Sequence, residues 1–137
     1  MHLQFRMMKY GLRKNPSKVI EQVKATFPAP DQEVFMQEHM QQAFLASVEE
    51  MIRQGTDGMV YEAGLLSRPW GFSVDEIQMP VKIWYGGQDT NTPPQMGRYF
   101  AEHVPNVDTH FMPNEGHFSI ITRNIAEMIR AITPQST

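Results

Sequence analysis

The sequence predicts an α/β protein with a helical N-terminal half, followed by a strand–helix–strand–helix unit with two parallel strands. Apolar residues recur at helical spacing through the first half. In the second half, two β-rich runs, Val81–Trp84 and Val107–Met112, flank a helix that begins with two prolines. A chain of 137 residues with 41% hydrophobic and 20% charged residues can bury a globular core. We therefore expect two parts, residues 1–55 and residues 56–137.

Two helices are expected in residues 1–55. Asn15 is a typical N-cap before Pro16, and the helix that they begin ends before Pro28. Asp31 can cap a second, longer helix, after which Gly55 is a typical C-terminal residue. The apolar stripe of this second helix consists of Phe35 or Met36, Met40, Phe44, Val48, Met51 and Ile52. The first dozen residues fit a helix and a strand equally well.

The elements of residues 56–137 follow in a regular order. A short helix is expected at 59–66, an irregular turn at 67–72, and the first strand after Pro80. Pro93-Pro94 begin a helix that continues to about His103, and the second strand follows at 107–112. The last helix carries an apolar stripe of Ile121, Ile125, Met128, Ile129 and Ile132, and ends at Thr133-Pro134.

A parallel strand–helix–strand unit should have a right-handed crossover, but two parallel strands make an incomplete sheet. Parallel sheets are normally buried on both faces and contain several strands. We therefore expect this sheet to be completed by missing sequence, by another chain or by a second copy of the same chain.

Composition narrows the possible functions. The formal charge of −3, without long blocks of like charge, gives no sign of a nucleic-acid partner or of an acidic membrane surface. The lack of cysteine excludes disulfides, thiolate metal sites and a cysteine nucleophile, and fits a reducing cytoplasm. No apolar run reaches the roughly 18 residues of a membrane span, and Met1–Tyr10 lacks a signal-peptide core. We expect a soluble, cytoplasmic protein.

Two ionisable residues follow the ends of the two predicted strands. Asp89 follows Gly86-Gly87-Gln88, and His117 follows Asn114-Glu115-Gly116. Because the carboxyl ends of neighbouring parallel strands lie close together, the carboxylate and the imidazole can form the base-orienting half of a hydrolytic triad.

The residues from Arg68 to Ile132 resemble the C-terminal part of the α/β-hydrolase fold. The resemblance lies in the order and spacing of Pro80–Asp89, Pro93, Val104-Pro105-Asn106 and Met112–His117. It implies that Asp89 is the acid of a catalytic triad and that His117 is its base. It also implies that residues 1–55 are the later part of a helical cap, and that the sheet belongs to an incomplete α/β-hydrolase core.

The chain departs from this family in lacking the nucleophile. The family's serine lies in a G-x-S-x-G turn before the acid and the base, and no serine of this sequence has glycines at that spacing. Ser119, two residues after the histidine, is expected to be a cap or packing residue rather than a substitute nucleophile. We therefore expect a hydrolase of ester, amide or related bonds when the missing portion is present, and an inactive chain without it.

Each of these residues has a simpler interpretation. Asp89 can serve only the turn, by accepting from the backbone of Asn91, and His117 can be an ordinary surface or core histidine. Met36, Met40 and Phe44 are either core residues or the lining of an apolar substrate pocket.

No cofactor or metal ion is expected. Gly86-Gly87 lacks the residues of a phosphate-binding or dinucleotide-binding loop, and the five histidines show no metal-binding spacing. The alternative function is a non-catalytic, homo-oligomeric interaction module derived from the fold, associating through the exposed sheet edge. Other chemistry on the same scaffold, including that of dehalogenases, peroxidases, acyltransferases and lyases, stays open, because the nucleophile is not in view.

Overall fold

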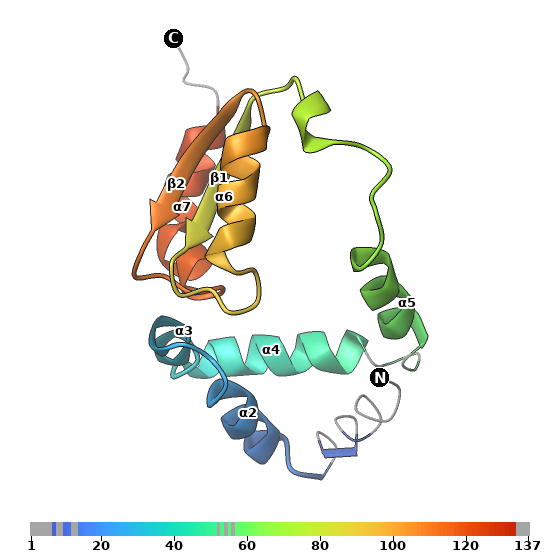
Figure 1. Ribbon diagram of the computed structural model, residues 1–137. Coiled ribbons are helices and arrows are strands. Elements are labelled where there is room, and N and C mark those ends of the chain that lie inside the picture. Colours follow the sequence, from blue (N-terminus) through green and yellow to red (C-terminus); the bar gives the residue numbers. More distant parts are fainter. Residues whose placement is uncertain are drawn as a thin grey trace. The chain divides into compact units, whose positions relative to one another are not determined.

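The computed structural model describes residues 7, 10, 11, 14–51, 53, 55 and 57–133 (Figure 1). Several predictions concern residues outside the described ones: most of the first dozen residues, Ile52 of the predicted stripe and Pro134 at the predicted helix end. Among the helices within them, none is long and apolar enough to span a membrane.

The chain divides into two compact units, each described by itself below. One unit comprises Met1–Thr26 and Phe35–Trp70, and the other comprises Phe27–Val34 and Gly71–Thr137. This division differs from the sequence-based boundary at residue 55. The main boundary between the units lies after Trp70. The short segment Phe27–Val34 belongs to the C-terminal unit because it contacts residues far away in the sequence.

The first unit is helical. It contains α2 (Pro16–Lys24), α4 (Glu38–Met51) and α5 (Asp57–Leu66). The predicted cap of α2 is confirmed, since the Asn15 side chain accepts from the backbone N–H of Lys18 at 3.0 Å. Val48 of α4 is the buried centre of a small core, around which four half-buried side chains pack: Val19, Phe44, Leu45 and Met59.

The prediction of one long helix from Asp31 to residue 52 is wrong. The structure has a six-residue helix, α3 (Ala29–Val34), in the second unit, and a turn at residues 35–37 before α4. Gln41 closes this turn by donating from Nε2 to the carbonyl oxygen of Phe35 at 2.6 Å. Asp31 lies inside α3 rather than at the N-terminus of a long helix. Gly55 has a φ of 114°, in the left-handed region that favours glycine, but it does not directly follow the helix, because α4 ends at Met51.

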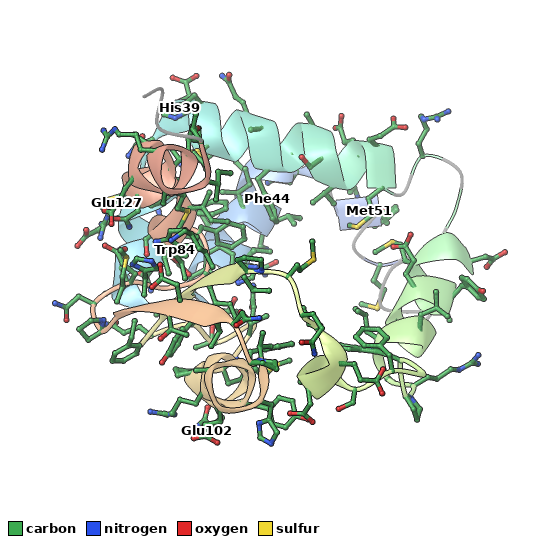
Figure 2. The ribbon with its side chains drawn as sticks, turned by 90° about the horizontal axis from the view of Figure 1, so that it is seen from above. His39, Phe44, Met51, Trp84, Glu102 and Glu127 are labelled. Atoms are coloured by element: carbon green, nitrogen blue, oxygen red, sulfur yellow. The ribbon has the colours of Figure 1, made fainter. Side chains whose placement is uncertain are left out.

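The second unit also contains η1 (Val74–Glu76), β1 (Val81–Gly86), α6 (Pro94–His103), β2 (Val107–Met112) and α7 (Ser119–Ile132). The two strands are parallel, with register from Val81 opposite Val107 to Gly86 opposite Met112. This confirms a mixed α/β fold with a two-stranded parallel sheet. In the views of Figures 1 and 2, α6 and α7 cover opposite faces of the sheet.

Side chains alternate between the two faces of this sheet. Trp84 lies on the α7 side (Figure 2) and stacks on His110 of β2, with ring centroids 4.6 Å apart. The next residue, Tyr85, packs toward α6, where a Cβ atom at Gly97 would collide with the Tyr85 ring. The absence of a side chain at Gly97 therefore lets α6 lie close against the sheet.

Part of this unit's apolar surface is uncovered. Four isoleucines at helical spacing on α7 are 47–68% exposed: Ile121, Ile125, Ile129 and Ile132. Most residues of β1 and β2 are only partly buried, although parallel strands are normally enclosed on both faces. Within the described residues, the sheet has two strands, each with one unpaired edge.

Candidate functional site

The candidate site lies where the two strands end. Because Gly86 pairs with Met112, β1 and β2 end side by side, and the loops that follow them run together. The backbone N–H of Gly87 donates to the Met112 carbonyl at 2.8 Å, and that of Gln88 donates to the Glu115 carbonyl at 2.9 Å. The loop carrying Asp89 is thereby bonded to the loop carrying His117.

The two glycines allow this close approach. A Cβ atom at Gly86 would lie within 3.0 Å of the backbone of Glu115 and Gly116. A Cβ atom at Gly87 would lie 2.5–2.9 Å from backbone atoms of Pro113. Gly86-Gly87 is therefore a packing feature, in which the lack of side chains brings two backbone segments together.

Asp89 is buried, and both of its carboxylate oxygens are in use. Oδ1 accepts from the backbone N–H groups of Asn91 and Thr92, each at 2.8 Å. Oδ2 accepts from the Thr92 hydroxyl at 2.6 Å and lies 2.9 Å from Nδ1 of His117. Both interpretations of Asp89 thus describe real contacts, because one oxygen bonds the turn and the other faces the imidazole.

The environment of Asp89 favours its ionised form. Burial raises the pKa of this carboxyl, but the hydrogen bonds from the Thr92 hydroxyl, the Thr92 backbone, His117 and the Asn91 backbone outweigh it. The pKa of Asp89 is therefore below its usual value. An ionised carboxylate can only accept a hydrogen bond. Nδ1 of His117 is therefore the donor in this contact and carries the hydrogen.

His117 has one nitrogen engaged and the other available. Nδ1 lies 2.9 Å from Asp89 Oδ2 and 3.4 Å from the Thr92 hydroxyl. Among the described residues, none hydrogen-bonds Nε2, and the side chain is 35% exposed. With the proton on Nδ1, the lone pair on Nε2 is free to take a proton from a hydroxyl group.

Asp31 is the residue of this site that the sequence analysis missed. Its carboxylate accepts three backbone N–H groups of the histidine loop: His117 at 2.9 Å, Phe118 at 3.0 Å and Ser119 at 2.8 Å. The sequence predicted that Asp31 caps its own helix. In the structure, Asp31 instead caps α7. No local signal could show this, because 86 residues separate Asp31 from His117.

Ser119 is not placed to act as a nucleophile. The residue is fully buried, and its Oγ accepts from the backbone N–H of Gly116 at 2.7 Å. The hydroxyl therefore closes the histidine loop onto the start of α7, as expected of a cap or packing residue.

The three candidate pocket residues lie in the other unit. Met36 is exposed in the turn before α4, whereas Met40 and Phe44 lie on α4 and are partly buried. Phe44 packs against Val48 and makes an edge contact with Phe35, with ring centroids 5.3 Å apart. The structure thus places Phe44 in the small core of the helical unit. Asp89 and His117, the two predicted catalytic residues, lie together in the second unit.

Comparisons of the chain with protein-family models, with curated proteins and with solved structures find no match. Within the described part of the chain, no three His, Asp or Glu side chains gather in a group that could hold a metal ion. The function is therefore inferred from the geometry of Asp89 and His117.

Proposed function

We propose that this chain supplies the acid and the base of a Ser-His-Asp triad in an enzyme of the α/β-hydrolase type, which cleaves an ester, amide or related bond. The observation that carries the proposal is the 2.9 Å contact between Asp89 Oδ2 and His117 Nδ1, with an Nε2 that no described residue hydrogen-bonds. The resemblance of the strand-end motifs to that family supports it. In this proposal, residues 1–55 belong to a helical cap, except Phe27–Val34, which joins the C-terminal unit.

Each residue has a defined task in this mechanism. Asp89 stays ionised, holds the imidazole in the Nδ1–H tautomer and stabilises the imidazolium that forms. His117 Nε2 takes the proton from the nucleophile's hydroxyl as its oxygen attacks the carbonyl carbon. The imidazolium then donates that proton to the leaving group, and a water molecule repeats the sequence to release the acyl group. Thr92 keeps Asp89 in place, because it bonds both carboxylate oxygens.

The nucleophile and the oxyanion hole come from another polypeptide segment in this proposal. The sequence contains no G-x-S-x-G turn, and Ser119 is buried and bonded. A base without a nucleophile and without donors for the oxyanion cannot complete acyl transfer. The chain by itself is therefore proposed to be inactive.

The uncovered surface of the second unit supports a partner of this kind. A segment bearing the nucleophile would add strands to the open sheet edge and cover the four exposed isoleucines of α7. The alternative, a non-catalytic module that associates with a second copy of itself, rests on the same surface. The two proposals differ in one measurable respect, since only the first requires His117 for a reaction.

Reconstitution tests the proposed hydrolase. The chain is co-expressed with an N-terminal α/β-hydrolase segment that contains the G-x-S-x-G turn, and hydrolysis of short-chain p-nitrophenyl esters is followed. We expect activity in the complex, and about a 10²–10⁴-fold lower kcat for His117→Ala, the range that a general base contributes.

His39→Ala is the matched control, because His39 is an exposed histidine of α4 in the other unit (Figure 2). This variant should keep full activity. A well-formed complex that shows no hydrolysis, or one whose activity survives His117→Ala, would contradict the proposal.

A further inference from the structure

Asp31 uses its whole carboxylate on the loop that carries His117. The residue is only 1% exposed. Oδ2 accepts from the backbone N–H of His117, and Oδ1 accepts from those of Phe118 and Ser119. Hydrogen bonds to an ionised carboxylate are about twice as strong as neutral ones, so three of them are a strong constraint on one short backbone segment.

Two of these donors, the N–H groups of Phe118 and Ser119, lie at the start of α7, where backbone N–H groups have no partner within the helix, and the third, that of His117, comes just before it. The residue before the helix, Phe118, provides no side-chain cap for α7. Asp31 satisfies these N–H groups from a different helix and places a negative charge at the N-terminus of α7, where the helix dipole favours it. The conformation of the histidine loop therefore depends on α3.

The fit between Asp31 and the loop is close. A Cβ atom at Gly116 would lie 2.5–2.6 Å from the carboxylate atoms of Asp31, so only glycine lets the loop approach this far. Two further contacts join the residues on either side of Asp31 in the sequence to the start of α7 and to α7 itself. The Phe27 ring packs against the Phe118 ring, with centroids 5.2 Å apart, and Glu33 accepts from Arg123 of α7 at 2.6 Å.

We propose that Asp31 is a positioning residue for His117. Two carboxylates hold the same histidine from different directions: Asp31 holds its backbone N–H, and Asp89 faces its imidazole Nδ1. With the backbone fixed by Asp31, the imidazole reaches Asp89 in a single orientation and presents Nε2 to the site. The catalytic consequence rests on the proposed function, whereas the positioning of His117 is a property of the chain alone.

The test compares Asp31→Asn with the wild-type chain by NMR. Asparagine keeps the shape, but it removes the charge and replaces one acceptor oxygen by an N–H donor that faces backbone donors. The readout is the hydrogen-bonded imidazole Nδ1–H resonance of His117, assigned with His117→Ala. We expect this resonance to disappear or broaden in Asp31→Asn, while the amide signals of β1 and β2 show an intact sheet. A merely structural role for Asp31 would lower stability and leave this resonance in place.

Glu33→Gln is the matched control. It removes the same charge from the same helix and breaks the contact with Arg123, but it touches no N–H group of the histidine loop. The His117 resonance should persist in this variant. An unchanged His117 resonance in folded Asp31→Asn, or equal losses in both variants, would overturn the proposal.

If Asp31→Asn does not fold, hydrogen exchange of the wild-type chain tests whether Asp31 holds the backbone of the histidine loop. The backbone amides of His117, Phe118 and Ser119 should exchange at least about tenfold more slowly than that of exposed Asn114, because Asp31 holds them. Exchange of these three amides as fast as that of Asn114 would overturn the proposal.

A kinetic arm in the reconstituted enzyme tests the catalytic consequence separately. Asp31→Asn should lower kcat by up to about 100-fold with little change in KM, because misplacement of a catalytic group slows the chemical step. If the NMR and exchange results hold and no hydrolysis is found, the hydrolase proposal fails and the positioning proposal stands.

Discussion

Asp89 shows how a single carboxylate serves a turn and a histidine together. The turn's backbone donors approach Oδ1, whereas His117 approaches Oδ2, and Thr92 reaches both oxygens. The sequence presented the turn and the triad as alternatives, because it does not show how the two oxygens are divided. The turn restricts the rotation of the Asp89 side chain, and so it also sets the direction in which Oδ2 meets the imidazole.

The lowered pKa of Asp89 predicts a pH dependence of stability. Its pKa is below the value of about 3.9 found for an aspartate in an unfolded chain. The ionised form therefore stabilises the fold above that value, and this stabilisation is lost as the pH falls through the folded-state pKa. Asp89→Asn should lower the free energy of unfolding at pH 7 by about 1–3 kcal/mol, the usual result of disrupting buried hydrogen bonds. Its stability should then change less than that of the wild type on acidification.

Urea unfolding between pH 7 and pH 3 measures this effect. Glu127→Gln is the control, because Glu127 is an exposed residue of α7 (Figure 2), and its pH profile should match that of the wild type. Parallel profiles for Asp89→Asn and wild type would show that the Asp89 carboxylate is not stabilised in the fold.

At the scale of elements, local signals located most of the helices and strands. Asn15-Pro16, Pro93-Pro94 and the β-rich run at 107–112 each mark an element whose limits depend on its own residues. The region around Asp31 behaves differently. Its helix ends at Val34, α3 and α4 belong to different units, and Asp31 bonds to α7 and not to the N-terminus of its own helix.

The contact between the two strand-end loops gives an element-scale prediction. Gly87→Ala would place a methyl group within 2.9 Å of three backbone atoms of Pro113, and backbone cannot rotate away as a side chain can. We expect a loss of about 1–3 kcal/mol in the free energy of unfolding, as for other overpacked sites. The imidazole resonance of His117 should also shift, because the loops separate.

Gly64→Ala is the matched substitution. Gly64 lies inside α5 with open space around its Cα, so alanine should stabilise that helix by up to about 1 kcal/mol. Thermal unfolding of both variants provides the comparison. A Gly87→Ala variant as stable as the wild type would show that the loops do not need their close approach.

At the scale of the whole molecule, the second unit exposes surface that parallel α/β folds normally bury. The exposed isoleucines of α7 and the unpaired edges of the two described strands are both surfaces that a partner would cover. This is why the proposed enzyme requires a nucleophile-bearing segment, and why the chain alone is expected to associate with itself.

Light scattering during size-exclusion chromatography tests this association. The chain alone should elute as a dimer or a larger species. Ile125→Glu should shift it toward the monomer while leaving the fold intact, because Ile125 is already about half exposed.

Glu127→Lys also changes a charge on α7, but it lies on the opposite side of the helix, two residues away, and should leave the size unchanged. A well-folded wild-type monomer would contradict the idea that this sheet needs completion.

The sequence by itself determined the order of most of the elements, the parallel pair of strands and the position of Asp89 and His117 at the strand ends. Those features depend on residues close together in the chain: periodicity, prolines, and turn residues after a strand. Only the tertiary structure decided that Asp31 caps α7, that Gly86-Gly87 packs against the histidine loop, and that Phe27–Val34 joins the C-terminal unit. Each of these depends on a contact between residues far apart in the chain, and local patterns carry no record of such contacts.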